Sequence, residues 1–343
     1  MVFAGLFIIL AVVLFAPFLV KKVEENLEVF LFIVGAIAVS ITSQWNMPLV
    51  EEAIVEPIKI TLAVFIAGFL FRFFQKTIAH NVNKIADSIG VKLFAFLVIV
   101  SLGLLSSVIT AIIAALVLVE IITCLTLKRK NEITLVILAC FSIGLGAALT
   151  PIGEPLSTIA IAKLKGMPHQ ANFLFLFRHL GLFIVPGIIL FGLLGAILMP
   201  GKRQKERGLA GKEETIKNIS VRTVKVYFFV MALIFLGQGF KPIINAYISS
   251  IPHQGLYWLN ALSAVLDNAT LAAAEIDSSM TLLQIKSAIL ALLIAGGMLI
   301  PGNIPNIICA GKLKIKSLEW AKVGVPLGLL VMAGCFFLLM FIK

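Results

Sequence analysis

Long apolar stretches separated by short polar loops run through most of the chain. The pattern predicts apolar segments at 2–20, 29–47, 57–74, 93–127, 133–165, 171–199, 226–240, 255–276, 282–311 and 323–342. A helix needs about 20 apolar residues to cross a bilayer, and several of these stretches reach that length. The pattern therefore predicts an all-α integral membrane protein.

Composition excludes a soluble fold. Apolar residues make up 60% of the chain, charged residues 13%, and the mean hydropathy is +1.09. A soluble surface must be largely polar, and this chain lacks the residues to build one. The four cysteines all lie in apolar stretches without Cys/His clustering, which indicates packing roles.

The net charge of +11 is concentrated in short loops between apolar runs. That placement fits the positive-inside rule for membrane proteins and argues against nucleic-acid binding. We expect the protein to lie in the cell membrane. Segment 200–225 carries eight basic residues against three glutamates, and we expect it to be a linker on the cytoplasmic side. Segment 1–28 is interpreted as a retained N-terminal helix because it has no basic leader or cleavage site.

Proline and glycine interrupt the apolar runs. The stretch 133–165 is interrupted at 150–155, the stretch 282–311 at 301–306, and we expect 93–127 to break at Gly103 and Ser106-Ser107. Non-helical backbone at membrane depth occurs only where protein or a water-filled cavity surrounds it. The interruptions are therefore candidate binding positions.

The two halves resemble each other. Gly153-Glu154 and Lys163 match Gly302-Asn303 and Lys312 at a constant separation of 149 residues. Upstream, 105–108 matches 262–265. We expect two inverted-topology repeats, 29–199 and 226–343, each with a re-entrant hairpin (93–127 and 255–276) and a broken transmembrane helix. This topology puts Lys163 and Lys165 outside, against the positive-inside rule.

Buried carboxylates indicate the chemistry. Glu154 lies in the first interruption and Asp267 in the second hairpin, and a charge at mid-bilayer costs about 3 kcal/mol on insertion scales. One interpretation is a structural carboxylate that caps helix N–H groups. The other is an acid that binds Na⁺ when ionised and a proton when empty. Oxygen and amide groups nearby extend the candidate ion-binding set to Asn268, Asn303, Asn306, Thr150, Ser106, Ser107, Thr110, Ser157, Ser263 and Thr270.

The segment Thr150-Pro151-Ile152-Gly153-Glu154-Pro155 resembles the T-P-I-G-[DE]-P stretch of the ion transporter superfamily, which includes arsenite-pump membrane subunits and NhaD-type sodium/proton antiporters. Residues 263–270 resemble its S-x-x-x-D-N hairpin tip, and the size is closest to a small prokaryotic branch of predicted cation transporters. The resemblance implies inverted repeats, a central site at Glu154, Asp267 and Asn268, and a homodimer. Thr110-Ala111 and Asn303 depart from the acidic pattern, which leaves the ion stoichiometry open.

The favoured function is secondary active Na⁺/H⁺ antiport by alternating access, with no cofactor besides the transported cation. The alternative is sodium-coupled symport of an anion such as a dicarboxylate, although the S-N-T-type motifs of carboxylate carriers are missing. A channel or sensor on the same fold is a third possibility. No Walker, G-x-S-x-G or H-E-x-x-H motif occurs, so we do not expect an enzyme.

Overall fold

The computed structural model describes residues 2–125, 127–201, 215–247, 252–266 and 268–341, and within these ranges every regular element is a helix. The elements are α1 (Val2–Leu19), α2 (Lys21–Glu25), α3 (Leu27–Ile41), α4 (Met47–Ile89), α5 (Val91–Ile109), α6 (Ala111–Cys124), α7 (Arg129–Ala147), α8 (Pro155–Lys163), α9 (Phe175–Leu198), α10 (Ile216–Tyr247), α11 (His253–Leu259), the 3-10 turn η2 (Asn260–Ala264), α12 (Asn268–Glu275), α13 (Leu282–Gly296), the 3-10 turn η3 (Ile300–Gly302), α14 (Ile304–Leu313) and α15 (Ser317–Phe341).

Six of the described helices are long and apolar enough to cross a bilayer: α1, α5, α7, α9, α10 and α15. The prediction of an all-α, multi-pass membrane protein is confirmed at that level. Shorter apolar helices, including α6, α13 and α14, complete the apolar body. Of the predicted linker, 202–214 lies outside the described residues, and α10 already begins within it at Ile216.

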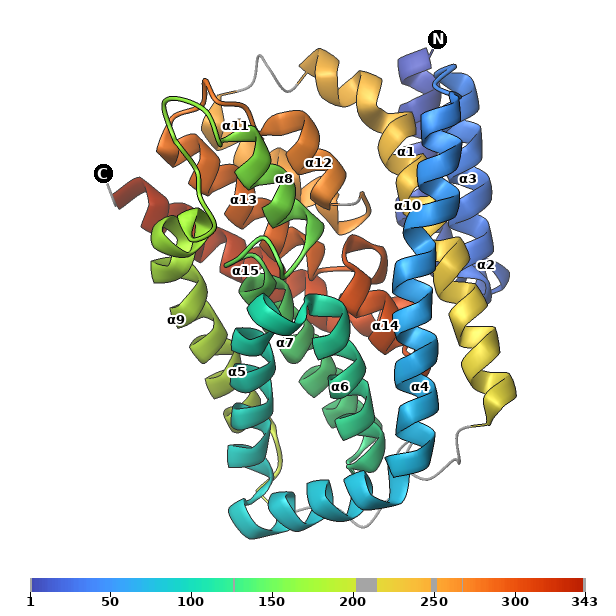
Figure 1. Cartoon of the computed structure of the whole chain (residues 1–343), viewed down its shortest axis with the longest axis vertical. Helices are drawn as coiled ribbons and strands as arrows, with labels where there is room; N and C mark the ends of the chain where they lie inside the picture. The colour runs from blue at the N-terminus through green and yellow to red at the C-terminus, as the bar shows by residue number, and fades with distance from the viewer. Residues whose placement is uncertain (1, 126, 202–214, 248–251, 267, 342–343) are drawn as a thin grey trace.

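One side of the molecule is a group made by α3, α4 and α10 (Figure 1). The helix α4 runs without interruption through both the predicted span 57–74 and the more polar residues 75–89 that follow it. Its lower part turns to lie across the end of the molecule (Figure 1). Gly35 and Gly239 let α3 and α10 approach closely, because a Cβ on Gly239 would meet Ala38 at 2.6 Å.

The helices α5 and α6 form a hairpin that turns over at mid-height (Figure 1). The predicted break at Gly103 and Ser106-Ser107 is wrong, because α5 continues through all three residues to Ile109. The serine hydroxyls donate to carbonyls three residues earlier, Gly103 and Leu104, at 2.7 Å, which a helix accommodates. The chain turns instead at Thr110, with a positive φ of 74°.

Two later helices are interrupted at the predicted places. The first, α7, ends at Ala147, and α8 begins at Pro155; α13 ends at Gly296, and α14 begins at Ile304. Proline occupies one of the first two positions of both α8 and α14, where its missing N–H is not needed. The interruptions 148–154 and 297–303 are the irregular segments on which the candidate site is built.

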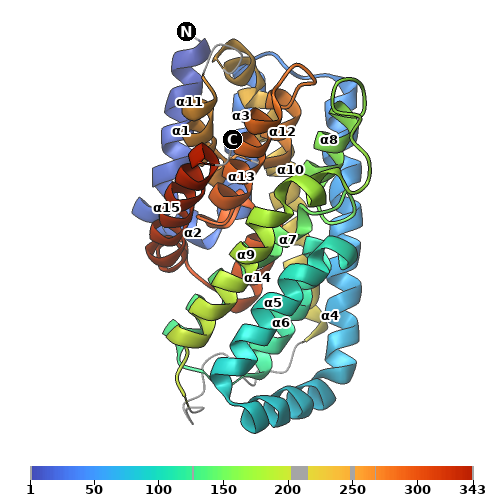
Figure 2. The same cartoon turned by 90° about the vertical axis from the view of Figure 1, so that its left-hand side faces the viewer.

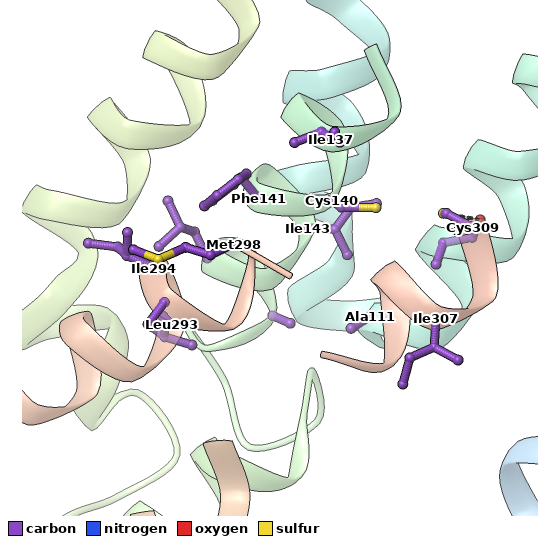
Figure 3. Packing of buried hydrophobic residues seen from close by; sticks show 14 of the residues in the cluster. Ala111, Ile137, Cys140, Phe141, Ile143, Leu293, Ile294, Met298, Ile307 and Cys309 are labelled. Atoms are coloured by element: carbon purple, nitrogen blue, oxygen red, sulfur yellow. Dashed lines mark hydrogen bonds between the residues drawn. The ribbon is translucent and has the colours of Figure 1, made fainter. Parts of the chain in front are cut away.

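The core surrounds α7, which packs against α5 and α9 and is buried along nearly all of its length. Figure 3 shows Phe141 of α7 beside Ile294 and Met298 of the α13 end, with Cys140 pointing toward Cys309 of α14. Phe141 also stacks on Phe191 of α9, with ring centroids 5.3 Å apart. Figure 2 shows the same body from the side, with α9 crossing in front of α7. These contacts hold the second interruption against α7, the buried helix that leads into the first interruption.

Candidate functional site

Both interruptions end in a buried polar residue with extended backbone. Glu154 has φ −157° and ψ 159°, and Asn303 has φ −154° and ψ 148°. Each occupies the N-cap position of the following helix, but neither side chain makes a capping hydrogen bond. The interpretation of Glu154 as a helix cap is therefore not supported by its geometry. The first turns of α8 and α14 therefore begin without a side-chain cap.

The first interruption is fastened to the tip of the hairpin α5–α6. The Ala111 N–H donates to the Gly153 carbonyl at 2.9 Å, and the Thr150 hydroxyl donates to the Ser107 carbonyl. Thr110 accepts a long 3.4 Å bond from the Ile113 N–H and so caps α6. Hairpin tip and interruption therefore form one hydrogen-bonded unit.

The second interruption is held by asparagine amides. Asn306 donates to the carbonyls of Gly296 and Leu299 at 2.8 and 2.9 Å, which bridges the gap between α13 and α14. Asn303 lies against Gly144 of α7, where a Cβ would meet its Nδ2 at 3.1 Å. The Asn268 amide lies beside Gly296 at the end of α13. This interruption thus lies against both Asn268 of α12 and the central helix α7.

The same backbone approach occurs in both interruptions. A Cβ on Gly153 would lie 2.0 Å from the Ala147 carbonyl oxygen, and one on Gly302 would lie 2.5 Å from that of Gly296. Only glycine fits so close to a preceding carbonyl. Gly153 and Gly302 are 149 residues apart, and so are the acceptors Ala147 and Gly296.

Three buried polar atoms near the interruptions have no hydrogen-bond partner within the described structure: Ser157 Oγ, Asn306 Oδ1 and Asn268 Nδ2. The three residues are 0%, 0% and 4% exposed. A buried polar atom without a partner costs about 1–3 kcal/mol, so such groups are normally satisfied. Hydroxyl and amide oxygens suit a hard cation, and the Asn268 amide can present its oxygen by rotating about its last bond.

Other predicted ligands have their hydroxyl protons engaged elsewhere. Ser106 donates to the Ile143 carbonyl at 2.9 Å as well as to Gly103, and Ser263 donates to the Leu292 carbonyl at 3.0 Å. Ser107 donates within α5. These hydroxyls join helices together. Asp267 and the side chain of Thr270 lie outside the described residues.

Two polar pairs outside the predicted ligand set are also buried. Glu120 of α6 forms an ion pair with Lys312 of α14, and Glu275 of α12 accepts a 2.8 Å hydrogen bond from Asn260. The sequence places Glu120 in an apolar run and Glu275 near the end of the predicted second hairpin, at the membrane interface, but it gives no sign of Asn260 as a partner. Among the described residues, no group of three His, Cys, Asp or Glu side chains converges as a metal cluster. Among the described residues, the interruptions contain one carboxylate, that of Glu154, together with neutral oxygens of the kind that hard cations accept as ligands.

Fold and site together define a multi-pass helical membrane protein with buried polar groups at two interrupted helices. The chain belongs to the family described as "Protein of unknown function (DUF1646)", whose model matches residues 3–342. No curated protein matches its sequence.

Proposed function

We propose that this chain is a secondary active cation transporter, most simply a Na⁺/H⁺ antiporter that works by alternating access. The observation that carries the proposal is a set of buried polar atoms at the two interruptions for which the described residues offer no hydrogen-bond partner; one of them, Ser157 Oγ, follows the buried Glu154 by three residues. A cation bound there would satisfy the orphaned oxygens of Ser157 and Asn306 and the charge of the glutamate.

The two halves are proposed to be inverted repeats. The equivalent serines Ser106 and Ser263 donate to Ile143 and Leu292, and these two acceptors are themselves 149 residues apart. Equivalent donors thus bond to equivalent acceptors in the two halves. This agreement supports a shared local structure, because similarity between apolar sequences alone would not produce it. In Figure 1 the hairpin α5–α6 rises from the lower end, whereas α11 and α12 lie at the upper end. That arrangement supports re-entrant hairpins entering from opposite sides.

The packing between halves is reciprocal. The helix α6 of the first hairpin packs on α14, and α12 of the second packs on α8. Each contact ends in a lysine: Lys312 pairs with Glu120, and Lys163 donates to the Ala273 carbonyl. This reciprocity supports the inverted topology and gives Lys163 a partner on the side where the positive-inside rule disfavours it. The basic linker is proposed to be cytoplasmic, together with the lower end of α4.

In the proposed cycle, Glu154 binds Na⁺ as a carboxylate and takes up a proton when Na⁺ leaves. Burial disfavours an ionised carboxylate with no bound cation. Either Na⁺ or a proton must therefore be bound before the site can change from facing one side of the membrane to facing the other. That requirement is what couples the two fluxes. The hairpins, each fastened to an interruption, are the elements that would open the site to one side at a time.

A sodium-coupled anion symporter is the second candidate. The observation in its favour is that the N–H ends of α8 and α14 are left without side-chain caps beside amide donors such as Asn268. Helix N-termini attract anions, so a carboxylate substrate could bind next to the cation.

Proteoliposomes containing the purified protein and a pH-sensitive dye test the proposal. Addition of Na⁺ should dissipate a preset pH gradient, and Glu154→Gln, which keeps the shape and removes the charge, should abolish that response. The control is Glu56→Gln, an exposed acid paired with Lys59, which should respond as the wild type does. A wild-type protein that moves no cation against protons refutes antiport. Uptake of a labelled dicarboxylate only with Na⁺ would establish the symporter instead.

A further inference from the structure

Glu275 is a buried acid that the proposed cation site does not use. It ends α12, outside the six apolar spans, and is 5% exposed. Two residues later, Asp277 is fully exposed, so burial begins abruptly at this position. An ionised carboxylate at a buried helix end has a high desolvation cost when no described cation pairs with it. The cost falls when the carboxyl group is protonated and therefore uncharged.

The hydrogen bonding around Glu275 compensates a carboxylate only in part. Asn260, itself 1% exposed, donates its amide to Oε2 at 2.8 Å and makes a longer contact of 3.4 Å to the Ala288 carbonyl of α13. The second oxygen, Oε1, is buried with no hydrogen-bond partner in the described part of the chain. One neutral donor and one oxygen without a partner leave a buried carboxylate at this position poorly compensated.

The charged groups on neighbouring elements do not compensate a carboxylate here. Burial raises the pKa of Glu275 from 4.5 to about 8, the Asn260 hydrogen bond opposes that rise, and no cation contributes. The elements packed against α12 carry described cations at Lys163 of α8, Lys286 of α13, and Lys217, Lys225 and Lys241 of α10; the side chain of Arg222 on α10 lies outside the described residues. Lys163 is instead engaged with the Ala273 carbonyl.

The position of this pair within the hairpin suggests what a proton would do. Asn260 lies on the first arm, at the start of η2, and Glu275 ends the second arm, so their hydrogen bond ties the two arms together. Both η2 and α12 pack on α13. Loss of the proton would leave a buried charge between the arms and favour their separation or the entry of water.

We propose that Glu275 is a proton-binding site in the second hairpin, distinct from the central cation site, and that its proton closes this hairpin on α13. The binding of the proton stands on the local geometry alone. Its coupling to cation movement rests on the proposed function, because the same hairpin carries Asn268 to the cation site.

Infrared spectroscopy of the purified protein tests proton binding without any transport. Between about pH 5 and pH 10, which bracket the ordinary and raised values, a protonated-carboxyl band should disappear with a midpoint near the raised pKa. Glu275→Gln should remove that component, and Asp277→Asn should retain it. Because the Asn260 amide favours the charged form, Asn260→Leu should shift the midpoint upward. An unchanged band in Glu275→Gln, or an unshifted midpoint in Asn260→Leu, overturns the proposal.

Thermal unfolding gives a second readout. A carboxyl whose pKa is raised on folding contributes stability at low pH that is lost as the pH rises through about 8, so Glu275→Gln should flatten the pH dependence of Tm. In proteoliposomes, Glu275→Gln should keep Na⁺-driven proton movement but lose its pH dependence near that value. Absence of exchange in the wild type would count against the proposed function alone. Normal exchange with an unaltered pH profile in Glu275→Gln would overturn the coupling.

Discussion

Ser157 on α8 and Asn306 on α14 stand 149 residues apart, and each buries a polar oxygen that no described residue hydrogen-bonds. The same separation relates Glu154 to Asn303, three residues earlier in each helix. Two helices that begin alike therefore present orphaned oxygens at matching positions. Under the proposed function, both oxygens would contribute to the cation site.

Ser157→Ala should weaken cation binding and leave stability nearly unchanged. Its hydroxyl has no partner to lose within the described protein, whereas a bound ion would lose one ligand worth about 1 kcal/mol, or roughly fivefold in affinity. The half-saturating Na⁺ concentration in the proteoliposome assay measures the effect. Ser142→Ala is the matched control, because that hydroxyl bonds the Ile99 carbonyl at 2.9 Å and its loss should lower Tm without changing Na⁺ affinity. Wild-type affinity in Ser157→Ala would remove this residue from the site.

Gly146→Ala should damage the fold severely. A Cβ there would lie 1.7 Å from the Gly103 carbonyl oxygen, at the crossing of α5 and α7, and backbone on both sides cannot yield. We expect a loss of more than about 2 kcal/mol, seen as a lower yield of folded protein and a lower Tm. Gly311→Ala in α14 has open space around its Cβ and should be neutral or stabilising by up to about 1 kcal/mol. Equal behaviour of the two variants would contradict the helix crossing described.

The ion pair between Glu120 and Lys312 should be sensitive to removal of one partner. Both side chains are largely buried, at 12% and 9% exposure, so Glu120→Gln removes a charged partner from a buried cation and should cost about 3 kcal/mol of unfolding free energy. The double variant Glu120→Gln/Lys312→Met should recover part of that loss. Tm in detergent measures both, and the exposed pair Glu56–Lys59, treated the same way, should change stability by less than about 1 kcal/mol. A double variant no better than the single one would show that the two groups do not interact.

Several features were predictable from local chemistry. The interruptions at 148–154 and 297–303 follow from prolines that cannot continue a helix, and the apolar spans follow from hydropathy. The equivalence of Ser157 and Asn306 could also have been predicted from the constant separation of 149 residues, although the two residues were predicted only as separate ligands.

Other features were not predictable from local signals. Gly103 and Ser106 look like helix breakers, but α5 runs through them because the serine donates to Gly103 and Ile143 and the glycine admits α7. The partnership of Asn260 with Glu275 spans 15 residues and depends on how the two hairpin arms fold together.

The sequence by itself determined that this is a multi-pass helical membrane protein with two interrupted helices, because apolar length and proline act locally and need no partner. Only the tertiary structure decided which polar atoms are left unsatisfied, because a serine or asparagine is a ligand, a cap or a packing bond according to which carbonyl lies opposite it. The Ser106 hydroxyl donates a hydrogen bond to the Ile143 carbonyl, whereas the Ser157 hydroxyl has no hydrogen-bond partner among the described residues.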